Sequence, residues 1–141
     1  MNQKPIDQAV IEHLLTRPTI ARLSGGRIGV RQEGGNAPPA VVVELYSLVP
    51  LMTHQGPCDL ATFGYQIEVS GLLRSTAFEL AREIQLELHG LTGVIAGLRI
   101  DNHEVEMTAS NRPSKREGGE LYDWQCLLDA TGLCVVDVPN R

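Results

Sequence analysis

The sequence predicts an α+β fold, with an antiparallel or mixed β-sheet of about four to five strands and two α-helices packed on one face. Three observations predict it. Two segments repeat apolar residues at helical spacing, and several others alternate polar and apolar residues as strands do. Most of the strand-like segments also follow one another without the intervening helix that a parallel pair needs. A length of 141 residues fits one domain, residues 1–141.

The first helix is expected from about Pro5 to Thr16. Its apolar residues recur on one face, at Ile6, Val10, Ile11, Leu14 and Leu15. Proline suits the first turn, where its missing N–H is harmless, and Pro18 ends the helix. The apolar piece Ile20–Leu23, stopped by Gly25-Gly26, is interpreted as a helical turn.

Three strands are expected next, at Arg27–Arg31, Val41–Leu48 and Leu60–Gly71. Loops rich in Gly and Pro separate them, the second running through Pro50 to Gly56-Pro57. The third strand has the clearest alternation, with Phe63, Tyr65, Ile67 and Val69 on one face and polar side chains on the other. This pattern predicts one covered face and one face that is solvated or contacts a polar partner.

The second helix is expected from about Ser75 to His89. Thr76 and Glu79 have the spacing of a capping box, and Gly90 suits the C′ position. The predicted buried stripe consists of Ala77, Leu80, Ala81, Ile84 and Leu88.

The rest of the chain predicts further strands and one long loop. Val94-Ile95 and Leu98–Met107 are strand material, and Thr108–Gly119 is a polar loop. Glu120–Asp129 alternates again, Thr131-Gly132 is expected to turn the chain, and Leu133–Val138 is expected to form a last edge strand.

Two of the predicted loops are candidate protein contacts. Val49-Pro50-Leu51-Met52 places apolar residues where a loop is usually polar, which indicates either a contact through Val49, Leu51 and Met52 or a loop folded back over the sheet. The long loop carries three cations on an acidic chain, at Arg112, Lys115 and Arg116. It would either dock a complementary protein surface or form a solvated hairpin tip.

Acidic side chains follow one line along the second helix. Glu79, Glu83 and Glu87 recur every four residues and so share one face. We expect either a solvated outer face or an acidic surface shared between subunits of an oligomer.

Catalytic and cofactor motifs are weak, and no enzyme activity, metal or cofactor is expected. In the cluster Asp101, His103, Glu104 and Glu106, the imidazole is expected on the face of Asp101, opposite the two glutamates, as part of a polar strand face. The glycine pairs do not form a phosphate-binding motif. His54 and Cys58 lack a third group to orient the base.

Composition excludes several partner classes. The net charge is −5, and there are only one Trp, three Tyr and two Phe. Nucleic-acid binders need a basic field and stacking surfaces, and anionic membranes also attract basic proteins. No signal peptide or membrane span is expected, so the chain is predicted to be made in a cytoplasm with Cys58, Cys126 and Cys134 as reduced thiols.

The order and spacing of these segments resemble the tail terminator, or tail-completion, proteins of long-tailed bacteriophages and related prophage elements. The resemblance covers roughly Val41 to Asp129. The matching segments are Pro38-Pro39-Ala40-Val41-Val42-Val43, Gly56-Pro57, Tyr65-Gln66-Ile67-Glu68-Val69, Ala77–Ile84, Leu91–Ile100 and Tyr122–Leu128.

The resemblance implies a structural virion protein at the head-proximal end of the tail. Such proteins form a hexameric ring that caps the tail tube, ends its polymerisation and presents a surface to the head–tail connector, while double-stranded DNA later passes through the lumen. An acidic lumen would repel DNA phosphates, and Glu79, Glu83 and Glu87 are the expected lining. The alternatives are another connector component, such as an adaptor or stopper, and a small cytoplasmic α+β binding module or enzyme.

Overall fold

The structure is a computed structural model that describes residues 4–32, 37–53, 56–115 and 122–135; the side chains at 53–58 and 109–123 are not among those described. In chain order the elements are α1 (Ile6–Leu15), α2 (Pro18–Ser24), β1 (Ile28–Gly29), β2 (Ala40–Thr53), β3 (Gly56–Gly71), α3 (Arg74–Leu88), β4 (Gly93–Ile95), β5 (Leu98–Lys115) and β6 (Tyr122–Val135).

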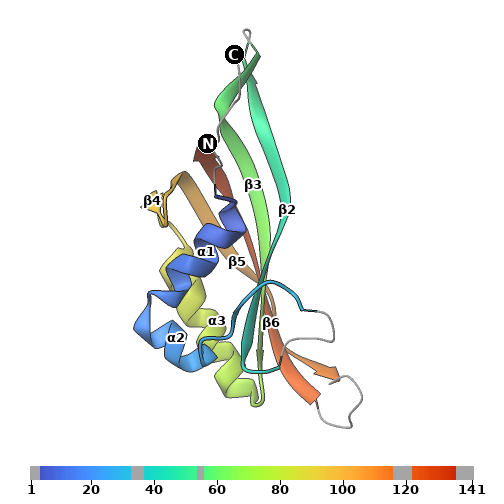
Figure 1. Ribbon diagram of the computed structural model, residues 1–141. Helices are drawn as coiled ribbons and strands as arrows, with labels where there is room; N and C mark the ends of the chain where they lie inside the picture. The colour runs from blue at the N-terminus through green and yellow to red at the C-terminus, as the bar shows by residue number, and fades with distance from the viewer. Residues whose placement is uncertain (1–3, 33–36, 54–55, 116–121, 136–141) are drawn as a thin grey trace.

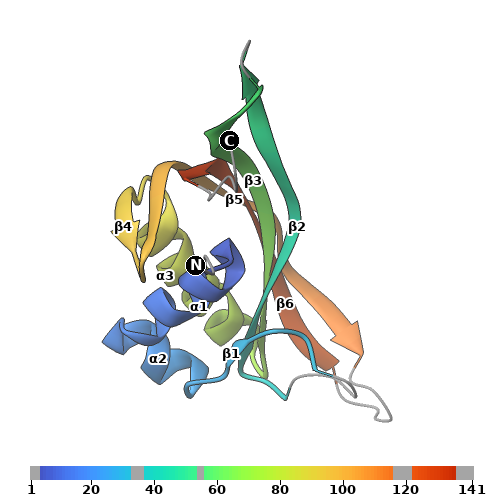
Figure 2. The same ribbon diagram turned by 45° about the horizontal axis from the view of Figure 1, so that its top comes forward.

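The strands form one mixed sheet in the order β1-β2-β3-β6-β5-β4. The β1–β2 pair is parallel and the other pairs are antiparallel. The sheet twists strongly, and the three helices lie on one side of it (Figures 1 and 2). The α+β prediction is therefore confirmed, with six strands and three helices among the described residues instead of four to five and two. The short elements β1, β4 and α2, with two, three and seven residues, overlap the strands predicted at Arg27–Arg31 and Val94-Ile95 and the helical turn predicted at Ile20–Leu23.

The core lies between the helices and one face of the sheet. The predicted inward residues of β3, from Phe63 to Val69, are buried, as is the whole predicted stripe of α3. Burying one large aliphatic side chain contributes roughly 1.5–3 kcal/mol, so these two stripes are the main attachment of α3 to the sheet. In α1 the exception is Leu15, which is 42% exposed although the periodicity places it inward.

The predicted loop at Val49–Met52 is wrong, because β2 and β3 form one long hairpin. Val49 pairs with Thr62 and Pro50 with Ala61, and the pairing continues to Thr53 and Gly56. Pro50 read as a loop signal, but proline is tolerated on an edge strand, where its missing N–H faces away from the ladder.

Much of the predicted loop Thr108–Gly119 is also strand. β5 continues to Lys115, with Arg112 opposite Gln125 and Pro113 opposite Trp124 of β6. β5 is free of β4 along this stretch, so Pro113 again occupies an edge. Residues 116–119 lie outside the described part of the chain.

The turn expected at Thr131-Gly132 does not form, because β6 is one continuous strand. The glycine serves a close approach instead: a Cβ atom on Gly132 would lie 1.9 Å from the backbone oxygen of Asn102. The predicted edge strand Leu133–Val138 is consequently wrong for its described part. Cys134 lies inside the sheet, between Ala61 of β3 and Ile100 of β5.

Only the C-terminal end of α3 agrees with the prediction. The helix begins at Arg74 after Leu73, which makes no side-chain cap, and the Thr76 hydroxyl donates to the Leu73 carbonyl, so the capping box is wrong. At the other end, Gly90 follows the C-cap with φ +79° and confirms the predicted glycine stop. β4 and β5 are then joined by a two-residue turn in which Ala96 and Gly97 both have positive φ.

Candidate functional site

The β2–β3 hairpin projects beyond the helix layer as an arm (Figures 1 and 2). Val49 and Met52, two of the predicted contact residues, are 54% and 71% exposed, and Leu51 is half-buried. Leu48 adds a further exposed apolar side chain on the same strand. The arm is therefore a candidate contact surface, although it is built from strand and not from a loop.

The free backbone edge of this arm is interrupted. β1 pairs only with Val41 and Val42, so the rest of β2 has no strand neighbour on that side among the described residues. Pro50 has no N–H to offer, and the pairing of β2 with β3 shifts register between Leu45 and Ser47 and between Pro50 and Met52. Prolines and bulges on an edge hinder pairing with another strand. The arm is therefore better suited to contact through its side chains than to pairing with another strand.

The opposite edge of the sheet is covered by the end of α3. The backbone N–H of Gly90 donates to the His103 carbonyl at 2.8 Å. The Val105 N–H donates to Nδ1 of His89 at 3.0 Å, and Nε2 of Gln85 donates to the Val105 carbonyl at 3.2 Å. These three bonds occupy backbone groups of β5 that another strand would need.

The predicted basic cluster lies on the β5–β6 hairpin. Arg112 and Lys115 lie in β5, where their backbone pairs with that of Gln125 and Tyr122 in β6. Arg116 lies outside the described residues. Because β5 continues to Lys115, two of the three cations belong to a strand.

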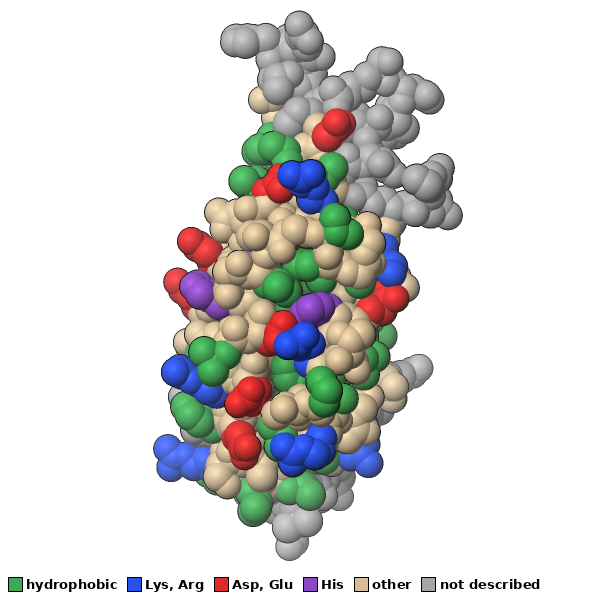
Figure 3. Space-filling view, turned by 90° about the vertical axis from the view of Figure 1, so that its left-hand side faces the viewer, with side chains coloured by type: hydrophobic (Ala, Val, Ile, Leu, Met, Phe, Trp, Pro, Cys, Tyr) green, Lys and Arg blue, Asp and Glu red, His purple; other side chains and the backbone are tan. Residues whose placement is uncertain are grey.

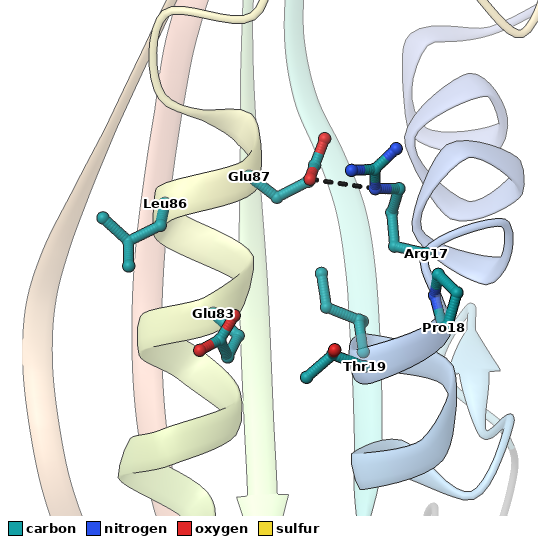
Figure 4. Close-up of a pocket in the computed structure, with 7 residues that line it drawn as sticks. Arg17, Pro18, Thr19, Glu83, Leu86 and Glu87 are labelled. Carbon is teal, nitrogen blue, oxygen red and sulfur yellow. Dashed lines mark ion pairs between the residues drawn. The ribbon is translucent and has the colours of Figure 1, made fainter.

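The three acidic residues of α3 have different surroundings. Glu79 is exposed and Glu83 is half-buried. Glu87 faces the corner between α1 and α2, where its carboxylate lies 2.9 Å from Nε2 of His13 and 3.0 Å from Nε of Arg17 (Figure 4). This carboxylate, with a side chain only 19% exposed, joins three helices and departs from the expected solvated face.

A pocket of about 220 Å³ opens beside this ion pair, between α2 and α3. Glu83 and Thr19 flank it on opposite sides, and Leu86 also contributes to its lining (Figure 4). The cation and one of the two carboxylates in its wall already neutralise each other, so the pocket does not concentrate charge of one sign. The helix side of the molecule as a whole likewise mixes acidic and basic side chains (Figure 3).

The face of the sheet that points away from the helices is more acidic, and we call it the far face. The pairing register places five carboxylates on it, at Glu44, Glu68, Glu104, Glu106 and Asp129. The sequence predicts a polar face on β3, but it does not show that these five residues share one face, because they lie on four different strands.

Arg31 bridges two of the carboxylates on the far face. The Arg31 guanidinium binds Glu44 at 2.6 Å and also binds Glu68, and these hydrogen bonds raise the pKa of Arg31. Nε2 of Gln125 donates to the other oxygen of Glu68 at 2.5 Å. The Tyr46 hydroxyl donates to Asp129 at 2.7 Å and this bond raises the tyrosine pKa. These links leave Glu104 and Glu106 exposed.

The predicted polar cluster around His103 is divided by the sheet. The β5–β6 register shifts between Ile100 and Asn102, which turns His103 inward, away from the face of Asp101. The imidazole is 2% exposed and lies 2.6 Å from the Tyr65 hydroxyl. Burial lowers the pKa of His103 to about 4, so the ring is neutral near pH 7. The placement on a polar strand face is therefore wrong.

The described residues hold no group of three or more side chains suited to a metal ion. Cys126 and Cys134 are buried cysteines outside any disulfide, within the part of the chain that the structure describes, in line with the prediction. His54 lies outside the described residues, and so does the side chain of Cys58. Among the described residues no helix is long and apolar enough to cross a membrane.

Comparison with protein-family models gives no match, and comparison with curated proteins gives none either. Among solved structures the fold is similar to a chain described as "Virion of native gene transfer agent (GTA) particle", with a TM-score of 0.65 and 16% sequence identity. The match covers 92% of this chain and 94% of that one, so the likeness extends over nearly the whole fold.

Proposed function

We propose that this chain is a structural protein of a phage or phage-like virion and that it has no enzymatic activity. The observation that carries the proposal is the likeness, over 92% of the chain, to a chain of a gene transfer agent virion. The absence of a metal-ligand cluster among the described residues is compatible with it. The resemblance in segment order to tail terminator proteins is an independent reason to consider the same class.

Within the virion, we propose the role of tail terminator. The chain would form a ring, in the family a hexamer, on the last ring of the tail tube, stop further polymerisation and offer its other side to the head–tail connector. The basic positions Arg112, Lys115 and Arg116 are the proposed contact with the tube, because they bring positive charge to a chain of net charge −5.

We also propose that the far face lines the lumen of this ring. Glu79, Glu83 and Glu87 are the residues expected there from the sequence, but Glu87 is paired with His13 and Arg17. The far face carries five carboxylates, of which Arg31 binds Glu44 and Glu68, while Glu104 and Glu106 are exposed. A negative wall repels the phosphates of passing DNA.

The experiment is deletion of the gene in the parent particle, followed by electron microscopy. We expect tails of irregular or excessive length, whether or not filled heads join them, and normal tails after complementation in trans. Normal tails without complementation would refute the terminator role. Antibody labelling of intact particles checks the broader claim, and a protein absent from the particle would refute it.

An adaptor or stopper of the head–tail connection is the second candidate, since the virion comparison names a whole particle and not a position in it. Deletion would then leave tail length normal and block joining alone.

A further inference from the structure

One hydrogen bond between the end of α3 and the edge of β5 has a titratable acceptor. The Val105 N–H donates to Nδ1 of His89 at 3.0 Å, whereas the bonds from Gly90 and Gln85 end on carbonyl oxygens of β5. A backbone N–H can only donate, so Nδ1 carries no proton in this contact and the ring proton is on Nε2. The contact therefore requires the neutral imidazole in one tautomer.

A second proton on this ring would turn the attraction into repulsion. Protonation places an N–H at Nδ1, so that two donors face each other and the Val105 N–H loses its acceptor. The His89 side chain is exposed, so water can deliver the proton to it. Histidine is the side chain that changes charge in mildly acidic solution, which makes acid the signal that would break this bond.

The position of His89 in α3 is compatible with a charged ring. His89 is the C-cap of the helix, and its N–H donates to the Gln85 carbonyl at 2.9 Å. A positive charge at the C-terminus of a helix interacts favourably with the carbonyl groups that end there. Protonation would therefore weaken the attachment of α3 to β5 without a matching loss inside the helix.

The other charges at this end of the molecule do not hold a charged His89 against β5. A charge on His89 or on His13 of α1 repels one on His103 of β5. The carboxylates in the neighbouring parts of α3 and β5 are paired with other cations or lie on the far face; they are Glu87, Asp101, Glu104 and Glu106. Within the described part of the chain none of these carboxylates is paired with the His89 ring.

We propose that His89 makes the attachment of α3 to β5 sensitive to acid, because a proton on Nδ1 breaks its bond to Val105 and loosens the end of the helix. The bonds from Gly90 and Gln85 do not titrate, so they keep the helix near the strand while the Val105 N–H becomes free. A free backbone group on a sheet edge is open to water and to pairing with an extended segment of another chain. The change takes place within one chain and does not depend on the proposed virion role.

The test is amide hydrogen exchange on the full chain at about pH 7.5 and about pH 5.5, resolved to single residues by fragmentation mass spectrometry. Each rate is divided by the intrinsic rate at the same pH. The protection of Val105 is compared with that of Ile67, which lies in β3 between β2 and β6 and reports on the intact sheet. We expect acid to lower the protection of Val105 relative to Ile67 by roughly two- to tenfold, as for the loss of one hydrogen bond.

His89→Asn separates the contact from the titration, because the side-chain oxygen of asparagine can accept the bond in place of Nδ1 and does not titrate. We expect this variant to keep Val105 protected at both pH values. His89→Ala should leave Val105 weakly protected at both. His13→Asn is the matched control, since it makes the same exchange on α1, where the ring binds Glu87, and it should keep the wild-type loss.

Equal protection of Val105 at the two pH values in the wild type would overturn the inference, as would a loss in acid that persists in His89→Ala. The alanine variant decides the question even where asparagine does not reach the strand, because removal of the ring must remove the acid step. A loss that disappears in His103→Gln but remains in His89→Asn would assign the response to the buried histidine, which also overturns the inference.

Discussion

The buried contact between His103 and Tyr65 makes the stability of the core depend on pH. Both side chains are almost fully enclosed, and the Phe63 ring packs edge-on against the imidazole, with centroids 5.6 Å apart. Burial lowers the pKa of His103 and raises that of Tyr65, so each is held in its neutral form.

We expect acid to destabilise the protein through His103. Its pKa is about 4 when folded and near 6.5 when unfolded, so the unfolded chain binds more protons between these values. The contribution is fully present above about pH 6.5 and declines as the pH falls toward 4, by about 3 kcal/mol in the free energy of unfolding. Urea unfolding at a series of pH values measures this loss.

His103→Gln is the control for this prediction, because the amide keeps a polar partner for Tyr65 but does not titrate. It should lower stability near neutral pH and flatten the decline between pH 6.5 and 4. An equally steep decline in this variant would assign the acid sensitivity to other groups.

The same histidine shows what the sequence could and could not predict at single positions. Regular alternation placed Phe63, Tyr65, Ile67 and Val69 correctly, because β3 keeps a period of two against β6 without a shift. On β5 the shift between Ile100 and Asn102 adds a residue and reverses the faces beyond it. A bulge of this kind depends on the neighbouring strand and has no clear local signal.

Gly132 illustrates the corresponding limit for whole elements. Glycine and proline often mark the ends of helices and strands, and this rule correctly predicted that α3 ends at Gly90. It failed at Pro50, Pro113 and Gly132, which lie within strands. Edge position explains the prolines, and close approach of β5 explains the glycine, and neither is visible before the strand order is known.

Substitution of Gly132 should therefore be costly although it lies in a strand. In Gly132→Ala the new Cβ would lie 1.9 Å from the Asn102 oxygen and 2.7 Å from the Phe63 ring. One of the two strands must move, and overpacking of this kind costs roughly 1–3 kcal/mol or more. Chemical denaturation measures the change in the free energy of unfolding.

Gly29→Ala is the matched comparison. Gly29 also lies in a strand, but nothing approaches the position of its Cβ within 4 Å. We expect a change within about 0.5 kcal/mol. Similar losses in both variants would show that strand glycines matter here for their backbone freedom and not for the contact at Asn102.

For the whole molecule, the two sides of the sheet suggest a division of roles. The helix side holds the core and mixes charges of both signs (Figure 3). The far face, by the pairing register, concentrates carboxylates. The fold class was predictable because periodicity reports which residues are buried. The far face was not, since its acids come together only when β2, β3, β6 and β5 are placed side by side.

Two charge reversals of equal size distinguish the lumen proposals. Glu104→Lys with Glu106→Lys makes the far face more basic, and Glu79→Lys with Glu83→Lys does the same on α3. We expect the far-face variant to assemble normally and to retain DNA during genome release. The retention should weaken with added salt, with a slope of about −0.9 in log K against log salt for each phosphate contacted. Release is measured as the fraction of particles emptied at several salt concentrations. Retention by the α3 variant instead would place α3 at the lumen.

The period of two in β3 has a consequence for how this chain tolerates change in its length. Odd and even positions of the strand serve opposite sides, so an exchange at one position leaves the other side intact. Deletion of a single residue would shift every following position to the opposite side, moving Ile67 and Val69 toward water and Gln66 and Glu68 into the core. β3 should therefore accept many substitutions but few changes of length. β2 and β5 should tolerate a change of length better near their register shifts, where the pairing already accommodates an extra residue.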